Sequence, residues 1–174
     1  TKTSEVIENG HNYRSELGLL YLNDFNRKAM QKIFAENDLE FTELFQCDVY
    51  VYLSNHHPLA GRDKITFEEL GDYPCLSFEQ GDKNSFYFAE EVFSTLQYKQ
   101  MIKADDRATM LNLMVGMNGY TLCSGIICEE LNGDGYSAIP LETDEKMTIG
   151  YIKRKGMHIS HIGKSYIEIL RGYA

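Results

Sequence analysis

The sequence lacks any apolar run long enough to cross a membrane, and it lacks the pattern of a secretion signal. A membrane-spanning helix needs about 20 consecutive, predominantly apolar residues, and no stretch of the 174 residues approaches that length. The first ten residues, TKTSEVIENG, are polar and do not run from a charged to an apolar segment. We therefore expect a cytoplasmic protein with no membrane partner.

The sequence also lacks the residue spacing of a metal or redox site. Its four cysteines lie in apolar segments outside any CxxC pair: Cys47, Cys75, Cys123 and Cys128. This pattern predicts reduced, mostly buried thiols and no disulfide framework. His56 and His57 are adjacent, so on an extended backbone they point in opposite directions, and no third ligand has suitable spacing. We expect neither a metal nor another cofactor.

Positive charge is scarce. There are 17 Lys and Arg against 26 Asp and Glu, which gives a formal net charge of −9. Binding to a phosphate backbone would therefore need a separate basic patch. The only basic run, Lys153 to Lys155, is typical of a solvated strand end. We do not expect this chain itself to bind nucleic acid.

The sequence does contain alternating strand and helix patterns. Asp48 to Ser54 alternates β-branched and aromatic residues, which predicts a strand with two packed faces. Leu17 to Leu22 is a continuous apolar run of the kind that is buried in a parallel sheet. Because 43% of the residues are apolar, there is enough material for a core. The alternation along the chain predicts a doubly wound α/β architecture.

Several predicted helices have recognisable first residues. Thr66 is followed three residues later by Glu69, which predicts a capping box and a short helix to Leu70. The other expected helices are Thr3 to Asn9 (capped by Thr3 or Ser4), Asn23 to Asn37 (capped by Asn23 or Asp24), Ser85 to Leu96, Ala108 to Val115 (capped by Asp105 or Asp106) and a final helix capped by Ser160. In the final helix, helical spacing predicts that Ile162, Tyr166, Ile169 and Leu170 face inward.

The order of these blocks resembles one known family. A strand is followed by His57-Pro58-Leu59-Ala60, then by the short helix ending at Leu70, then by a strand that opens at Pro74. Val115 to Ser124 supplies a helix end, a glycine turn and a strand, and Ala138 to Leu141 supplies a closing strand. This arrangement resembles the effector-binding domain of LysR-type transcriptional regulators.

The resemblance implies a two-lobed fold of the periplasmic-binding-protein type II class, with two crossing hinge segments. Residues 1–54 plus 146–174 would form lobe I and residues 55–145 would form lobe II. The family's helix-turn-helix domain and the opening strand, helix and strand of lobe I are absent from this chain. We therefore expect lobe I to be incomplete, DNA to be bound only through the absent domain, and the full-length protein to be a homo-oligomer.

Candidate ligand-binding residues lie in loops at strand ends and helix starts, where free backbone amides favour anionic groups. The resemblance points to Thr3, Ser4, Asn23, Gln80, Gly81, Asp82, Asn118, Tyr120 and Ser124. All of them except Ser124 also have a structural explanation. This is a helix cap for Thr3, Ser4 and Asn23, a solvated turn for residues 80–82, a left-handed turn for Asn118 and core packing for Tyr120.

The function implied is that of a sensor that binds a small polar or anionic metabolite between the lobes. A solute-binding protein of a transport system shares the architecture and is the alternative. We do not expect an enzyme, because it would need a titratable group with a positioned partner. Glu79, Asp82 and Cys123 are the only starting points for such a site.

Overall fold

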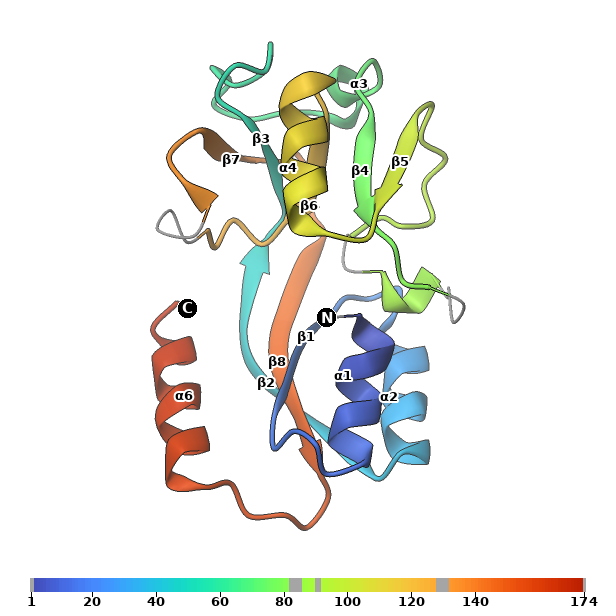
Figure 1. Ribbon diagram of the computed structural model, residues 1–174, viewed down its shortest axis with the longest axis vertical. Coiled ribbons are helices and arrows are strands. Elements are labelled where there is room, and N and C mark those ends of the chain that lie inside the picture. Colours follow the sequence, from blue (N-terminus) through green and yellow to red (C-terminus); the bar gives the residue numbers. More distant parts are fainter. Residues whose placement is uncertain (1, 82–85, 90–91, 128–131, 174) are drawn as a thin grey trace. The chain divides into compact units, whose positions relative to one another are not determined.

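A computed structural model describes residues 2–81, 86–89, 92–127 and 132–173 (Figure 1). The chain forms two compact units, and we describe each by itself. Unit 1 contains Thr1–Cys47, Gln80–Phe88 and Lys146–Ala174, and unit 2 contains Asp48–Glu79 and Ala89–Glu145. Compared with the expected division, residues 48–54 belong to unit 2 and residues 80–88 belong to unit 1.

Unit 1 is built on a three-stranded sheet in the order β1-β8-β2. Its elements are α1 (Thr3–His11), β1 (Gly18–Leu22), α2 (Arg27–Glu36), β2 (Leu39–Asp48), η1 (Phe86–Phe88), β8 (Lys146–Arg154) and α6 (His161–Arg171). The expectation that Leu17 to Leu22 lies buried in a parallel sheet is wrong. β1 is an edge strand that runs antiparallel to β8, with Leu20 opposite Gly150, and Leu19 is 36% exposed. An apolar run indicates burial but does not specify strand direction.

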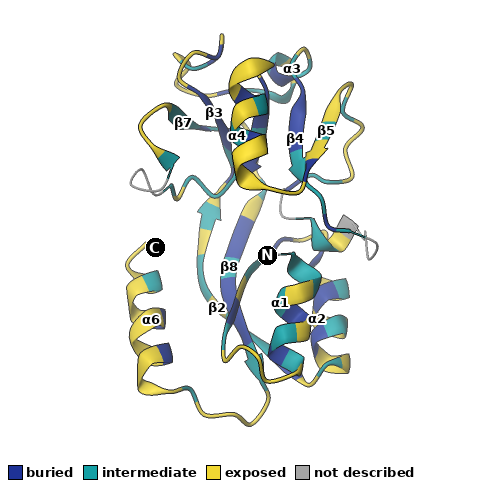
Figure 2. Cartoon of the chain, viewed as in Figure 1, coloured by how far each residue is buried: buried dark blue, intermediate teal, exposed yellow. Residues whose placement is uncertain are grey.

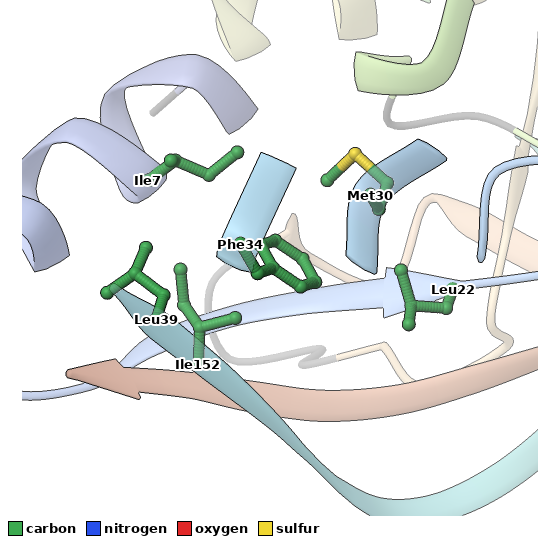
Figure 3. Packing of buried hydrophobic residues seen from close by; sticks show 6 residues of the cluster. All are labelled: Ile7, Leu22, Met30, Phe34, Leu39 and Ile152. Atoms are coloured by element: carbon green, nitrogen blue, oxygen red, sulfur yellow. The ribbon is translucent and has the colours of Figure 1, made fainter. Parts of the chain in front are cut away.

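The core of unit 1 lies between this sheet and the two helices α1 and α2 (Figure 3). Its buried side chains come from five elements: Ile7, Leu22, Met30, Phe34, Leu39 and Ile152. The rings of Phe34 and Phe41 stack with centroids 6.1 Å apart. This packing holds α1 against β1 and β8, and it thereby fixes where the N-terminus of α1 points.

Unit 2 is built on a five-stranded mixed sheet in the order β5-β4-β6-β3-β7. Its elements are β3 (Tyr50–Ser54), α3 (Phe67–Leu70), β4 (Cys75–Phe78), β5 (Met101–Ala104), α4 (Arg107–Gly116), β6 (Tyr120–Cys123) and β7 (Tyr136–Pro140). β4 is parallel to β5 and β6, whereas β3 is antiparallel to β6 and β7. Met110 and Met114 of α4 pack on Tyr52 and Leu76 of the sheet.

Three of the predicted helix caps are confirmed. Thr66 accepts a hydrogen bond from the amide of Glu69, Asp106 accepts one from Thr109, and Ser160 accepts one from Gly163. The hydrogen bond from Thr109 lowers the pKa of Asp106, because it favours the charged carboxylate.

The caps predicted for the first two helices are wrong. Thr3 is already helical and Lys2 is the N-cap of α1. The cap of α2 is Asn26 instead of Asn23 or Asp24. Asn23 and Asn26 each donate a backbone amide to the other's side-chain oxygen at 2.9 Å, and this reciprocal turn delays the start of the helix.

The helix predicted over Ser85 to Leu96 is also wrong. In the described part of this segment, Phe86–Phe88 form a short 3-10 helix and residues 92–95 form turns. Phe88 packs against the core of unit 1, whereas Val92 is buried and Phe93 packs on Phe67 in unit 2. The apolar residues with helical spacing therefore serve two different cores instead of one helix face.

The predicted inward face of α6 is wrong as well. Figure 2 shows a mostly exposed helix, and Ile162 is 82% exposed, with Tyr166 and Ile169 also exposed. Only Gly163 and Ile167 of α6 are buried. The helix therefore has an apolar stripe that the described residues leave open to solvent. No helix among the described residues is long and apolar enough to cross a membrane.

Replacing Ser160 with alanine should destabilise α6. The Ser160 side chain accepts from the Gly163 amide at 3.0 Å and donates to Glu16 at 2.8 Å, so its loss should cost about 1 kcal/mol. The matched control is Ser165→Ala, because Ser165 is exposed within the same helix. Urea unfolding curves of the two variants measure the difference, and equal stabilities would contradict the capping role.

Candidate functional site

The strongest candidate site lies at the N-terminus of α1 in unit 1. The backbone amide of Thr3 donates a hydrogen bond to the side-chain Oε1 of Gln80 at 3.1 Å, although the two residues are 77 positions apart. Both residues belong to unit 1, which places the loop after β4 against the start of α1. Two of the predicted site segments, Thr3-Ser4 and Gln80-Gly81, are thus brought together.

Gln80 carries a buried donor for which the described part of the chain supplies no partner. Its side chain is only 4% exposed, and its Nε2 has no hydrogen-bond partner among the described residues. The Thr3 amide can only donate, so the atom it contacts must be the Gln80 oxygen and the unpaired atom must be the NH2 group. A buried donor without a partner costs about 1–3 kcal/mol. A ligand or a water that accepts a hydrogen bond from this group would remove that cost.

Other donors surround this amide group. The Ser4 amide has no hydrogen-bond partner in the described part of the chain, and α1 contributes the positive end of its dipole. Gly81 has φ +76°, and a Cβ there would lie 2.9 Å from the Lys2 ammonium nitrogen. The ammonium group of Lys2 therefore lies close to the backbone of Gly81. Only glycine suits this position, because its φ is positive and a Cβ would meet Lys2. Glu5 is the acidic group of this turn, and it accepts from the Lys2 amide at 3.3 Å.

Asn23 has a structural role in unit 1. It is buried, and its side-chain oxygen is used in the reciprocal bond with Asn26 that precedes α2. Asp24 beside it is exposed. A ligand contact by Asn23 stays a prediction, and its hydrogen bonding with Asn26 already explains its burial.

Asn118 lies in unit 2 at the turn between α4 and β6. It has φ +50° and is exposed, so its left-handed conformation agrees with the turn reading. Its backbone carbonyl accepts a hydrogen bond from Nε2 of His57 at 2.9 Å. The buried His57 therefore positions this turn, while the Asn118 side chain is left to solvent. Ligand binding by that side chain stays a prediction.

The ring of His57 is kept neutral by burial and by the amide of Leu59, which donates to its Nδ1. The Asn118 carbonyl only accepts, so Nε2 must carry the proton, and the amide of Leu59 donates to Nδ1 at 3.1 Å. Burial lowers the pKa of His57 by more than the bond to the Asn118 carbonyl raises it. The ring also packs against Tyr73 with centroids 4.4 Å apart.

The remaining predicted site residues are placed differently. Tyr120 is only 2% exposed in β6, which favours its packing reading, and burial raises the pKa of its hydroxyl so that it stays protonated. Ser124 accepts a local hydrogen bond from the Ile126 amide at 3.4 Å. Asp82 lies outside the described residues.

The sequence analysis missed the roles of two residues, Lys2 at the start of α1 and His57 beside the Asn118 turn. Lys2 was not selected, although its position directly before a helix start places its charge near the free amides. His57 was considered as a metal ligand and as part of the His57-Pro58-Leu59-Ala60 block, but not as a residue that positions the turn at Asn118. Its position before Pro58, at the abrupt end of a strand, was the available sign of a structural role. The three described cysteines form no disulfide, and Cys128 lies outside the described part of the chain.

The chain has a similar sequence among curated proteins. Among curated proteins, the malolactic fermentation system transcriptional activator of Lactococcus lactis subsp. lactis (strain IL1403) is 27% identical over 137 residues. That match covers 76% of this chain and 46% of the relative, so the chain spans about half the length of the curated relative it matches.

Solved structures show the same fold. The effector-binding domain of QuiR in complex with shikimate has a TM-score of 0.65 at 19% identity, and the match covers 99% of this chain and 78% of that one. The reduced form of OxyR has a TM-score of 0.63 at 19% identity, with 99% and 77% covered. HinK of Pseudomonas aeruginosa, a LysR family regulator, has a TM-score of 0.65 at 14% identity, with 99% and 58% covered. These likenesses confirm the α/β fold of the periplasmic-binding-protein type II class.

The family comparison covers almost the whole sequence. Residues 3–174 match the LysR substrate binding domain, from the first residue of α1 to the last residue of the chain. The match therefore includes both units and every predicted site residue. The resemblance found in the sequence is confirmed, and the chain belongs to the family of LysR substrate binding domains.

Proposed function

We propose that this chain is the ligand-sensing part of a LysR-type transcriptional regulator and that it binds a small metabolite carrying a carboxylate or a similar anionic group. The observation that carries the proposal is the buried NH2 group of Gln80, which lies beside the N-terminus of α1 and has no hydrogen-bond partner among the described residues. The family match and the regulator relatives favour regulation over the transport alternative.

The chemistry of the site favours an anion. It offers the Gln80 NH2 group, the Ser4 amide, the helix dipole and the nearby Lys2 ammonium group, all of which donate hydrogen bonds or carry positive charge. Shikimate, which is bound by the QuiR domain, carries a carboxylate, the type of group that these donors would bind. The carboxylate of Glu5 is the opposing charge, and its bond to the Lys2 amide holds it at the cap.

The proposed action is regulatory. A ligand shifts a protein between two arrangements only if it binds one of them more tightly. We propose that the domain binds its ligand without making or breaking a covalent bond, and that binding alters the arrangement of DNA-binding domains elsewhere in a longer, homo-oligomeric, cytoplasmic protein. The family is one of transcription regulators, and the curated relative it matches is about twice as long as the matched part.

The test is a thermal-shift screen of the chain against organic acids, amino acids and shikimate. Gln80→Glu keeps an oxygen for the Thr3 amide but replaces the NH2 donor with an acceptor that repels an anion. We expect the best acid to bind this variant at least about tenfold more weakly, because a hydrogen bond to a charged group contributes about 1.5–3 kcal/mol. Isothermal titration gives the two dissociation constants.

Two further variants sharpen the result. Gln31→Glu is the matched control, because Gln31 is an exposed residue of α2 and the change adds the same charge. Asn118→Leu tests the candidate residue of unit 2. If the best acid binds Gln80→Glu as tightly as it binds Gln31→Glu, the site assignment at α1 is wrong. Unchanged affinity of Asn118→Leu would remove Asn118 from the site.

A further inference from the structure

Unit 2 contains a cavity that the proposed function does not use. Its volume is about 420 Å³, within the range of small-molecule sites. Five aromatic rings line it: Phe67, Tyr73, Phe93, Tyr98 and Tyr120. Leu70 and Tyr120 are its most buried lining residues. All of the lining residues belong to unit 2, whereas the Gln80 site lies in unit 1.

One wall of the cavity is held in a strained conformation. Phe93 has φ +63°, a value that bulky side chains rarely adopt. Its carbonyl accepts from the Tyr98 hydroxyl at 3.1 Å and from the Leu96 amide at 3.0 Å. Its ring meets Phe67 edge-on, with centroids 4.8 Å apart at 85°. The turn from 93 to 98 is thus fixed so that two rings, Phe93 and Tyr98, border the same space.

The rim of the cavity carries one positive charge. Lys99 lines the cavity, and its only described ion pair is with Asp72 at 3.5 Å. Both side chains of that pair are exposed, so the pair contributes little to stability and is easily exchanged. Asp72 itself does not line the cavity. A ligand in the cavity would therefore meet aromatic surface inside and an available ammonium group at the mouth.

We propose that this cavity binds a small aromatic carboxylic acid, with its ring among the aromatic side chains and its carboxylate at Lys99. The ring of such an acid can stack on the aromatic side chains of the lining or meet them edge-on, the two arrangements that aromatic pairs prefer. The charge at the rim selects an acid over an amine of the same shape. This is a second ligand site on the chain, and it does not depend on the site at α1.

The test uses 2-naphthoate as the probe with the full chain. Isothermal titration measures affinity, and amide chemical shifts in NMR spectra locate the site. We expect binding with shifts at residues 67–73 and 93–99, and an affinity about tenfold lower for Lys99→Met, in line with the loss of one hydrogen bond to a charged group. Lys64→Met is the matched control, because Lys64 is an exposed lysine of unit 2 paired with Glu142.

Two further comparisons distinguish specific binding of the acid from nonspecific hydrophobic binding. The cation 2-naphthylmethylammonium should bind at least about tenfold more weakly than the acid, because Lys99 repels it. Phe67→Leu should weaken the binding of 2-naphthoate, with a melting curve to show that the variant is folded. The proposal is overturned by an absence of binding, by shifts centred on Thr3 and Gln80, by equal affinities of Lys99→Met and Lys64→Met, or by a preference for the cation.

Discussion

Replacing Phe34 with alanine should destabilise the protein by about 3–5 kcal/mol, the usual cost of removing a buried aromatic side chain. Phe34 is buried in the core of unit 1, where it packs with Met30 and Leu39 and stacks on Phe41 (Figure 3). Its loss leaves a cavity between α2 and the sheet that rigid strands cannot close. Urea unfolding followed by circular dichroism measures the change.

The control for this prediction is Ile162→Ala in α6. In the sequence, Ile162 and Phe34 are both apolar residues at helical spacing. In the structure Ile162 is 82% exposed, so its removal should change stability by no more than about 0.5 kcal/mol. Equal losses in the two variants would mean that α6 buries its apolar stripe in solution, and the described exposure of Ile162 would then be incorrect.

Helix starts were predictable where the signal is local. Thr66, Asp106 and Ser160 each bond to an amide three residues later, so the sequence contains both partners of the interaction. The prediction that Asn23 caps α2 was wrong because Asn23 bonds to Asn26, and the two residues form a turn of their own before the helix. A capping residue and a turn residue have the same chemistry, and only their backbone conformation distinguishes them.

Packing directions were less predictable, because they depend on what lies opposite. The apolar stripe of α6 has helical spacing, but the described chain supplies nothing to cover Ile162 or Ile169. The run from Phe86 to Leu96 has the same spacing, yet the chain passes from unit 1 to unit 2 within it. Periodicity shows that side chains share a face only if the segment is one helix.

The residues Thr3 and Gln80 of the candidate site were named from the sequence, but the contact between them was not. Thr3 and Gln80 were both selected through the family resemblance, whereas their hydrogen bond joins positions 77 residues apart. No local pattern specifies such a pair. The Gln80 NH2 group is buried and has no partner among the described residues, and both properties depend on the folded chain and not on a local sequence pattern. Lys2 was missed for a related reason, because its closeness to Gly81 is set by the fold.

Replacing His57 with alanine should destabilise the protein by about 2–4 kcal/mol, because a buried amide without a partner costs about 1–3 kcal/mol and ring packing is lost as well. His57 is 4% exposed, accepts from the Leu59 amide and donates to the Asn118 carbonyl. The ring contact with Tyr73 also disappears. The matched control is His56→Ala, since His56 is the exposed neighbour in the sequence and should be nearly neutral.

The same residue should make stability depend on pH. The pKa of His57 is lowered from its ordinary value of 6.5, so below that pH the unfolded chain takes up a proton that the folded chain resists. The contribution of neutral His57 to stability is fully present above its pKa in the unfolded chain. It is lost as the pH falls from there through its lower pKa in the folded chain. Protonation would also turn Nδ1, the acceptor for the Leu59 amide, into a second donor facing it.

Urea unfolding between about pH 7.5 and about pH 5 isolates this contribution, because the carboxylates that titrate in the same range are common to all variants. The wild type and His56→Ala should lose stability in parallel as the pH falls. His57→Ala should start from lower stability and lose less over the same range, so that the curves converge in acid. Parallel curves for all three proteins would mean that His57 is protonated equally well in the folded and unfolded chain, and they would contradict this prediction.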